Sequence, residues 1–265
     1  MAKRIVIALV LSFITTIILG KFIIPLLKKI KAGQPVYEYV AQHKGKNGTP
    51  TMGGLFFIVP SIIVYYLTNN QSNRIASVAV VIGISYLIIG LVDDLIKIRS
   101  HKNQGLKAYQ KILFQSCIAI IAGGFSYANG ISIFHLPFFN FTVYLGVFSI
   151  PLIALIFIAT TNCVNLTDGI DGLAGNVSAI YLIFLVVLIY LQKNFSGSMY
   201  LLPSEYNSLI ILSSSLIGGI FGFLLFNTNK ASVFMGDTGS LSLGGFIASI
   251  SIFSSNSFLL LPSGL

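Results

Sequence analysis

The sequence is poor in charged residues, and acidic residues are the scarcest of them. Charged residues make up 9% of the 265 positions, whereas hydrophobic residues make up 55%, and the mean hydropathy is +0.89. A soluble domain carries about 25% charged residues, so this composition excludes an ordinary soluble globular protein. The apolar runs are too long and too numerous for a soluble core, and they predict a polytopic membrane protein.

Cysteine and histidine are also scarce. The two cysteines, Cys117 and Cys163, suggest neither a disulfide framework nor a zinc site. His43, His101 and His135 are scattered without the spacing of metal ligands. The chain has a net charge of +9, but its lysines lie between apolar runs. We therefore attribute them to membrane topology rather than to a nucleic-acid partner.

Eight apolar runs predict membrane-spanning helices. A helix needs about 20 residues to cross the bilayer, and the runs lack the period-two alternation of a transmembrane barrel. The first run follows Lys3 and Arg4 without a small-residue cleavage site, so we expect a retained span. We expect one all-α polytopic membrane domain over residues 1–265. The runs are Ile5–Leu27, Gly53–Leu67, Ile75–Val92, Ile112–Tyr127, Phe141–Thr160, Leu173–Leu191, Leu209–Phe226 and Leu241–Phe258.

Basic residues are distributed unevenly between the two sides of the predicted bundle. The loops after the first, third, fifth and seventh runs hold eleven basic residues, against four on the opposite side. The positive-inside rule places the richer side in the cytoplasm, and the three acidic motifs described below lie on that side. On the other side, residues Ala128–Asn140 alternate loosely and predict a small hairpin.

Five of the seven acidic residues fall in three short motifs at the ends of apolar runs. The first motif, LVDDLIKI, holds Asp93 and Asp94. Adjacent acids do not share a helix face, so we expect one to bind a cation and the other to accept a proton or orient a phosphate. Solvated acids at a helix end are the alternative, but carboxylates at a membrane edge are functional by default.

The second motif, NCVNLTDGIDG, repeats an amide or carboxylate side chain every three residues. On a helix this spacing forms one polar stripe, whereas the glycines favour a loop whose backbone approaches a ligand. Amides suit base edges, and carboxylates suit ribose hydroxyls or an imide N–H, so the pattern predicts a nucleoside site. Helix capping is the alternative. The four residues are Asn162, Asn165, Asp168 and Asp171.

The third motif, FMGDTGSL, places Asp237 between glycines. A carboxylate is a hard oxygen ligand suited to Mg²⁺, and Gly236 and Gly239 would let the backbone approach phosphate. Phe234 suits stacking on a base and equally suits a membrane-interface aromatic.

Two basic segments accompany the acidic motifs. The loop HKGKNGTPTMGG combines Lys46 with the hydroxyl of Thr51, which suits an anionic or nucleotide ligand. Lys97, Lys107 and Lys111 are also explained as plain positive-inside charges.

Taken in order, these motifs resemble those of the bacterial phospho-N-acetylmuramoyl-pentapeptide-transferases. The resemblance runs from about Gln34 to Leu243 and rests on GTPTMGG, VDDLIKI, NCVNLTDGIDGLAG and FMGDTGSL. The wider superfamily of polyprenyl-phosphate sugar-1-phosphate transferases shares the acidic motifs, but GTPTMGG and NLTDG resemble the peptidoglycan branch. The family fold has about ten transmembrane helices, of which this chain would hold about eight.

The resemblance implies an activity and a role for each motif. The activity is transfer of phospho-MurNAc-pentapeptide from UDP-MurNAc-pentapeptide to undecaprenyl phosphate, giving lipid I and UMP. It implies a site on the cytoplasmic face of the bacterial inner membrane, a Mg²⁺ cofactor and compatibility with a homodimer. By similarity, Asp237 ligates Mg²⁺, Asp93 and Asp94 serve the lipid phosphate, and Lys111 meets phosphate. The donor would be bound by Asn162, Asn165, Asp168, Lys46, Thr51, Asp171, Asn227 and Phe234.

Two features depart from the family pattern. The chain stops at LLLPSGL, where the ninth span of the family would begin, and lacks its histidine-rich stretch; Lys230 replaces a frequent proline. We therefore expect a C-terminally short chain that binds uridine but has little or no transferase activity. A sister transferase for another UDP-N-acetylhexosamine is an alternative. A transporter fits less well, because its ionisable groups would lie within spans rather than at their ends.

Overall fold

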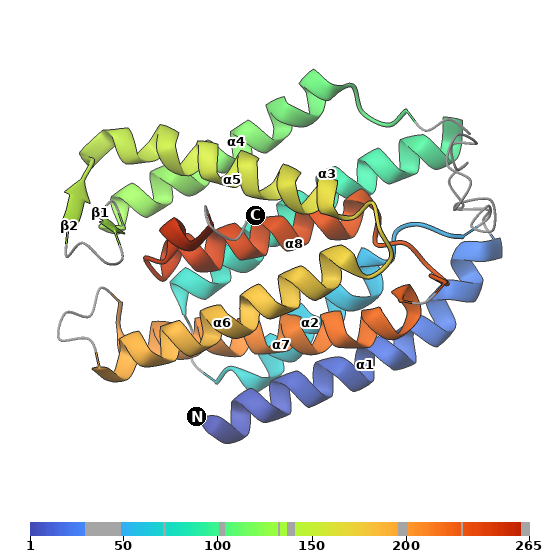
Figure 1. The fold of residues 1–265 in the computed structure, drawn as a ribbon, viewed down its shortest axis with the longest axis horizontal. Helices are drawn as coiled ribbons and strands as arrows, with labels where there is room; N and C mark the ends of the chain where they lie inside the picture. The colour runs from blue at the N-terminus through green and yellow to red at the C-terminus, as the bar shows by residue number, and fades with distance from the viewer. Residues whose placement is uncertain are drawn as a thin grey trace.

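The computed structural model describes residues 1–29, 49–70, 73–100, 104–131, 133–136, 141–195, 201–228 and 230–260. Within these ranges the protein is a bundle of eight α-helices with one short hairpin (Figure 1). The prediction of an all-α polytopic protein is confirmed. The helices are α1 (Ala2–Lys29), α2 (Gly54–Thr68), α3 (Arg74–Ser100), α4 (Ala108–Ala128), α5 (Ser149–Thr167), α6 (Leu173–Phe195), α7 (Pro203–Asn227) and α8 (Gly236–Phe253).

Six helices of the described part are long and apolar enough to cross a membrane. They are α1, α3, α4, α6, α7 and α5, the last extended by the 3-10 turn Gly146–Phe148. The other two are shorter, with 15 residues in α2 and 18 in α8. Each of the eight apolar runs therefore contributes a helix, while the number that cross the membrane stays a prediction.

The predicted fifth span begins too early. Its first residues, Phe141–Tyr144, form strand β2, which pairs antiparallel with β1 (Ile133–Leu136). Thr, Val and Tyr favour strands because they pack well on a pleated surface. Gly146 then adopts φ +53° and separates the strand from α5. The predicted hairpin exists, but its second strand uses residues that hydropathy alone assigned to the span.

α8 also begins earlier than the eighth apolar run. The run starts at Leu241, whereas the helix starts at Gly236 and ends at Phe253. A 3-10 turn, Ser257–Leu260, follows it. The motif residue Asp237 therefore lies inside the first turn of a helix rather than in the loop before it.

α7 and α8 form the centre of the bundle (Figure 1). Every residue from 238 to 253 is buried, and α8 packs mainly against α3 and α5. A Cβ at Gly244 would collide with the backbone of Thr161 in α5, so a small residue permits the close helix packing common in membranes. The outer helices expose apolar side chains such as Phe22 and Ile121, as expected for surfaces that face lipid.

The polar motifs gather at one end of this bundle. α3 and α5 finish there, and α2, α4 and α8 start there, because successive helices alternate in direction. The hairpin β1–β2 lies at the opposite end (Figure 1).

Candidate active site

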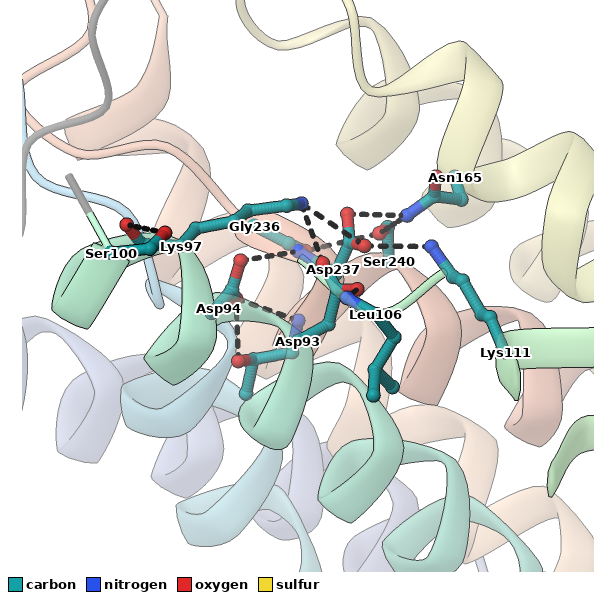
Figure 2. A network of polar contacts seen from close by, with 11 residues as sticks. Asp93, Asp94, Lys97, Ser100, Leu106, Lys111, Asn165, Gly236, Asp237 and Ser240 are labelled. Carbon is teal, nitrogen blue, oxygen red and sulfur yellow. Dashed lines mark hydrogen bonds and ion pairs between the residues drawn. The ribbon is translucent and has the colours of Figure 1, made fainter. Parts of the chain in front are cut away.

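The acidic pair of α3 meets the aspartate of α8 where the two helices pack together (Figure 2). Asp93 and Asp94 are buried near the end of α3, and Asp237 lies in the first turn of α8. One carboxylate oxygen from each of the three lies within 4.8 Å of the other two. Motifs far apart in the chain thus form one acidic cluster, as their one-sided distribution predicted.

Asp94 accepts hydrogen bonds from the first turn of α8. Its Oδ2 accepts hydrogen bonds from the backbone nitrogen of Thr238 at 2.9 Å and from the Thr238 hydroxyl at 2.6 Å. Its Oδ1 accepts one from the backbone nitrogen of Asp237 at 3.3 Å. The first N–H groups of a helix have no partner within the helix, and a carboxylate there also interacts favourably with the helix dipole. Asp94 therefore caps α8 from another helix and orients Asp237.

Glycines bring the surrounding backbone into direct contact with this helix start. A Cβ at Gly90 would collide with the backbone carbonyl of Asp237, so α3 touches α8 backbone to backbone. Gly236 adopts φ +72°, a conformation that glycine reaches without steric penalty. A Cβ there would also collide with the Thr51 hydroxyl and the Asp94 carboxylate. Packing therefore requires glycine at both positions.

Asp93 has one oxygen held by backbone and one that faces the cluster. Its Oδ1 accepts a hydrogen bond from the backbone nitrogen of Leu106 at 2.8 Å, and a Cβ at Gly105 would collide with the carboxylate. Its Oδ2 lies 2.6 Å from Nζ of Lys97, one turn further along α3. Apart from this ion pair, the buried Oδ2 has no hydrogen-bond partner among the described residues. It is the Asp93 oxygen that a bound cation would use.

Asp237 is the residue on which the polar contacts converge. Its Oδ2 lies 2.6 Å from Nζ of Lys111 and 3.2 Å from Nζ of Lys97. Its Oδ1 accepts a hydrogen bond from Nδ2 of Asn165 at 2.9 Å, and the same nitrogen donates to the Ser240 hydroxyl at 2.8 Å. Side chains from α3, α4, α5 and α8 therefore meet at this carboxylate (Figure 2).

The oxygen atoms of the cluster fit a divalent cation. Carboxylate oxygens are hard ligands of the kind that Mg²⁺ prefers. The three carboxylates carry more negative charge than the ammonium groups of Lys97 and Lys111 neutralise. Like charges held together in a buried site repel each other unless a counter-charge is present. Asp93 and Asp237 are the residues that would hold the ion, and Asp94 fixes the position of Asp237.

A second polar layer lies one helical turn deeper in the bundle. Gln115, one turn after Lys111 on α4, is fully buried, and its Oε1 accepts a hydrogen bond from Nδ2 of Asn162 at 2.7 Å. Asn162 precedes Asn165 by one turn of α5. This pair joins α4 to α5 directly below the level at which Lys111 and Asn165 reach Asp237. Asn162 thus contacts Gln115 rather than the acidic cluster.

The segment before α2 is joined to the segment before α8. The backbone nitrogen of Phe234 donates to the Pro50 carbonyl at 2.8 Å, and the nitrogen of Gly53 donates to the Phe234 carbonyl at 2.9 Å. Thr51 is fully buried between them, while Phe234 is partly exposed. The described residues of GTPTMGG, 49–54, and the start of FMGDTGSL therefore form one wall beside the acidic cluster.

Asp171 and Asn227 connect the loop after α5 to the same wall. Oδ2 of Asp171 accepts a hydrogen bond from the backbone nitrogen of Ala231 at 3.3 Å. Oδ1 of Asn227 accepts one from Gly172 at 2.9 Å, and its Nδ2 donates to the Val233 carbonyl at 2.9 Å. Asn227 is only 3% exposed, so its amide positions the backbone around the predicted uridine site.

Asp168 directly follows α5, and the residue as a whole is partly exposed. A carboxylate at a helix C-terminus is disfavoured by the helix dipole. Burial raises the pKa of Asp168 well above its ordinary value, and the neighbouring Asp237 and Asp94 carboxylates raise it further. Perturbed pKa values occur both at functional sites and in structural ion-pair networks, so the role of Asp168 stays a prediction.

Comparison with known proteins decides the family. The model of glycosyl transferase family 4 matches residues 75–255, and the phospho-N-acetylmuramoyl-pentapeptide-transferase signature 1 matches residues 46–58. The phospho-N-acetylmuramoyl-pentapeptide-transferase of Clostridium novyi is 38% identical over 249 residues, which cover 92% of this chain and 73% of the relative. The chain belongs to this transferase family.

Other phospho-N-acetylmuramoyl-pentapeptide-transferases support the same assignment. The Desulfitobacterium hafniense protein is 36% identical over 268 residues, covering 100% of this chain and 80% of that protein. The Campylobacter lari protein is 41% identical over 241 residues, covering 88% and 68%. The matched signature of the family spans the segment that packs against the start of α8.

Many of the site residues predicted from the sequence lie together in the structure. A connected set of contacts joins Asp93, Asp94, Lys111, Asn165 and Asp237. Lys46 lies outside the described residues, so its role stays a prediction. The roles of the remaining predicted residues also stay predictions: Thr51, Asn162, Asp168, Asp171, Asn227 and Phe234.

Sequence reasoning missed four residues that build the site: Lys97, Thr238, Ser240 and Gln115. Lys97 bridges two of the acids although its position suggested only membrane topology. Its spacing of four residues from Asp93 on one helix was a usable signal, since such pairs are neighbours on a helix surface. No comparable spacing connects Gln115 or Thr238 with its partner, because those partners lie on other helices.

Proposed function

We propose that this protein transfers phospho-MurNAc-pentapeptide from UDP-MurNAc-pentapeptide to undecaprenyl phosphate, giving lipid I and UMP. The observation that carries the proposal is the convergence of Lys97, Lys111 and Asn165 on Asp237 beside Asp93. A compact set of carboxylates and ammonium groups suits the joining of two phosphate-bearing substrates. Membership of the family supports the identity of those substrates.

The proposed reaction requires attack by one phosphate on another. An oxygen of undecaprenyl phosphate forms a bond to the β-phosphorus of the donor, and the bond from that phosphorus to the bridging oxygen breaks to release UMP. Charge accumulates on both phosphates during this exchange. Mg²⁺, held by Asp93 and Asp237, would neutralise that charge.

The side chains of the cluster have separate proposed roles. Lys111 and Lys97 would bind phosphate oxygens, since their ammonium groups already lie beside the acidic cluster. Asp93, whose Oδ2 would hold the cation, would orient the phosphate of undecaprenyl phosphate as its dianion rather than accept a proton from it. Asp94 has both oxygens engaged by the start of α8, so its proposed role is to position Asp237.

The nucleotide end of the donor is proposed to lie along the wall formed by the segments before α2 and α8. Phe234 is partly exposed there and would stack on the uracil ring. Asp171 and Asn227 shape that wall through their contacts with residues 231 and 233. Thr51 lies buried behind it, and Lys46 and Asp168 would complete the donor site.

The site is proposed to face the cytoplasm of a bacterial cell, in the inner membrane. The positive-inside rule supports this orientation, since the site lies on the side richer in basic residues. In that position the donor arrives from water and undecaprenyl phosphate arrives from the surrounding bilayer.

A donor comparison tests the proposal. The full chain in detergent is supplied with undecaprenyl phosphate, Mg²⁺ and either UDP-MurNAc-pentapeptide or UDP-GlcNAc, and lipid-linked product and UMP are measured. The proposed function predicts product from UDP-MurNAc-pentapeptide and none from Asp237→Asn, whereas the expectation of little or no transferase activity predicts no product from either chain. Product from UDP-GlcNAc alone would assign the chain to the sister activity, and no product from either donor would contradict the proposed function.

A further inference from the structure

The ammonium group of Lys97 occupies the space between two carboxylates of the acidic cluster. Its Nζ lies 2.6 Å from Oδ2 of Asp93 and 3.2 Å from Oδ2 of Asp237. These two side chains belong to the group whose oxygens lie within 4.8 Å of one another. Lys97 therefore sits where a cation bridging the two acids would bind (Figure 2).

We propose that Lys97 is an exchangeable counter-ion: its ammonium and the divalent cation occupy the position between Asp93 and Asp237 in turn. This inference rests on the proposed function, which places the cation at these residues. With the cation absent, Lys97 neutralises the acids and stabilises the fold. When the cation binds, Lys97 withdraws and its ammonium is free to meet an anionic phosphate.

Electrostatic repulsion favours the exchange. A divalent cation and an ammonium group that share two carboxylates would lie within a few ångströms of each other, and their repulsion in a partly buried site is large. The Lys97 side chain is 15% exposed, so solvent screens this repulsion only weakly. The two ions thus compete for the same oxygens rather than bind together.

Lys97 suits this role better than Lys111. Among the acids of the described residues, the ammonium group of Lys111 pairs with Asp237 alone, at 2.6 Å, and approaches it from α4. Lys97 contacts both acids and is attached to α3, the helix that carries Asp93. A lysine has a flexible four-carbon stem, so its ammonium can leave the acids without any movement of the helix.

A cation-binding experiment tests the competition. The full chain is purified in detergent without divalent cations and titrated with Mn²⁺, and bound ion is measured by electron paramagnetic resonance. We expect Lys97→Gln to bind Mn²⁺ about tenfold or more tightly than the parent chain, since a competing charge within a few ångströms is removed. The matched control is Arg99→Gln, which removes a charge from an exposed position in the last turn of the same helix. Its affinity should stay within about threefold of the parent, as expected for a screened surface charge.

Thermal unfolding gives a second readout, in which the proposal predicts the direction of the change in melting temperature with and without the cation. Without divalent cations, Lys97→Gln should unfold at a lower temperature than the parent, because the acids lose their counter-charge. Saturating Mg²⁺ should raise its melting temperature more than that of the parent. A lysine that serves only as a permanent structural ion pair would instead lower stability with and without Mg²⁺ and leave cation affinity unchanged or weaker.

The possible failures separate the two proposals. If the parent chain binds Mn²⁺ and Asp237→Asn does not, but Lys97→Gln binds with the parent's affinity, the cation site stands and the exchange is wrong. If Asp237→Asn binds Mn²⁺ as tightly as the parent, or if neither the parent nor Lys97→Gln binds it, the cation site is wrong as well.

Discussion

The carboxylate of Asp94 holds both the backbone nitrogen and the hydroxyl of Thr238, a residue 144 positions later in the chain. This contact makes an acid on α3 the cap of α8. Because Asp237 precedes Thr238 in the same helical turn, the contact also sets the place of the acid on which the other polar side chains converge.

Removal of this cap should separate stability from cation binding. Thr238→Val deletes the hydroxyl but keeps the backbone bond to Asp94, so we expect a loss of about 1 kcal/mol in unfolding free energy with Mg²⁺ dependence retained. Asp94→Asn removes the charge at a helix start and should cost more, about 1–3 kcal/mol. Thermal melts in detergent and a Mg²⁺ titration of activity measure both effects. Equal stability of Asp94→Asn and the parent chain would contradict the capping role.

Asp237→Asn should abolish turnover mainly through loss of the cation. Even residues that only support a metal ligand account for about 10–100-fold in metal affinity, so loss of the proposed ligand itself should weaken binding by roughly 100-fold or more. Turnover and Mn²⁺ affinity are measured in parallel. Glu205→Gln is the control, since this carboxylate accepts a hydrogen bond from Leu202 at the start of α7, far from the acidic cluster. An unchanged rate with unchanged Mg²⁺ dependence in Asp237→Asn would refute the assignment.

The backbone contact of α3 with α8 should not tolerate a methyl group. Gly90→Ala places a Cβ against the carbonyl of Asp237, and overpacking of this kind costs about 1–3 kcal/mol. We expect a lower melting temperature together with reduced turnover. The control is Gly124→Ala on α4, where a Cβ meets nothing within 4 Å and helix propensity improves by up to about 1 kcal/mol. Similar losses for both variants would argue against a specific contact at Gly90.

Asp168 should weaken the fold at neutral pH when no divalent cation is present. Because burial raises the pKa of this carboxyl in the folded state, the unfolded chain ionises first as pH rises, and stability falls until the folded carboxyl also ionises. Asp168→Asn cannot ionise, so it should melt at a higher temperature than the parent at pH 7. The difference should shrink as pH falls below 3.8, the ordinary pKa of aspartate, where the carboxyl becomes protonated in both states. Melting temperatures between about pH 3 and pH 8 in chelator check this, and a difference independent of pH would contradict it.

Much of the architecture follows from the sequence because each part has a local cause. Long apolar runs can satisfy their backbone groups in lipid only as helices, and all eight runs contribute one. The positions of the acids at helix ends, and on one side of the bundle, follow from counting runs and basic residues. One exception is the start of the fifth predicted span, where residues 141–144 pair with a neighbouring strand instead.

Tertiary structure decides which contacts each acid of the site makes. Asp93 and Asp94 are adjacent and chemically identical, and the sequence by itself determined only that they face different ways. Because α3 packs against α8, Asp94 accepts hydrogen bonds from Thr238, whereas Asp93 faces Lys97 and Asp237. The link between Gln115 and Asn162 is likewise set by how α4 and α5 lie together. A local pattern specifies the helix and the direction of a side chain, whereas its partner depends on which helices meet and at what level.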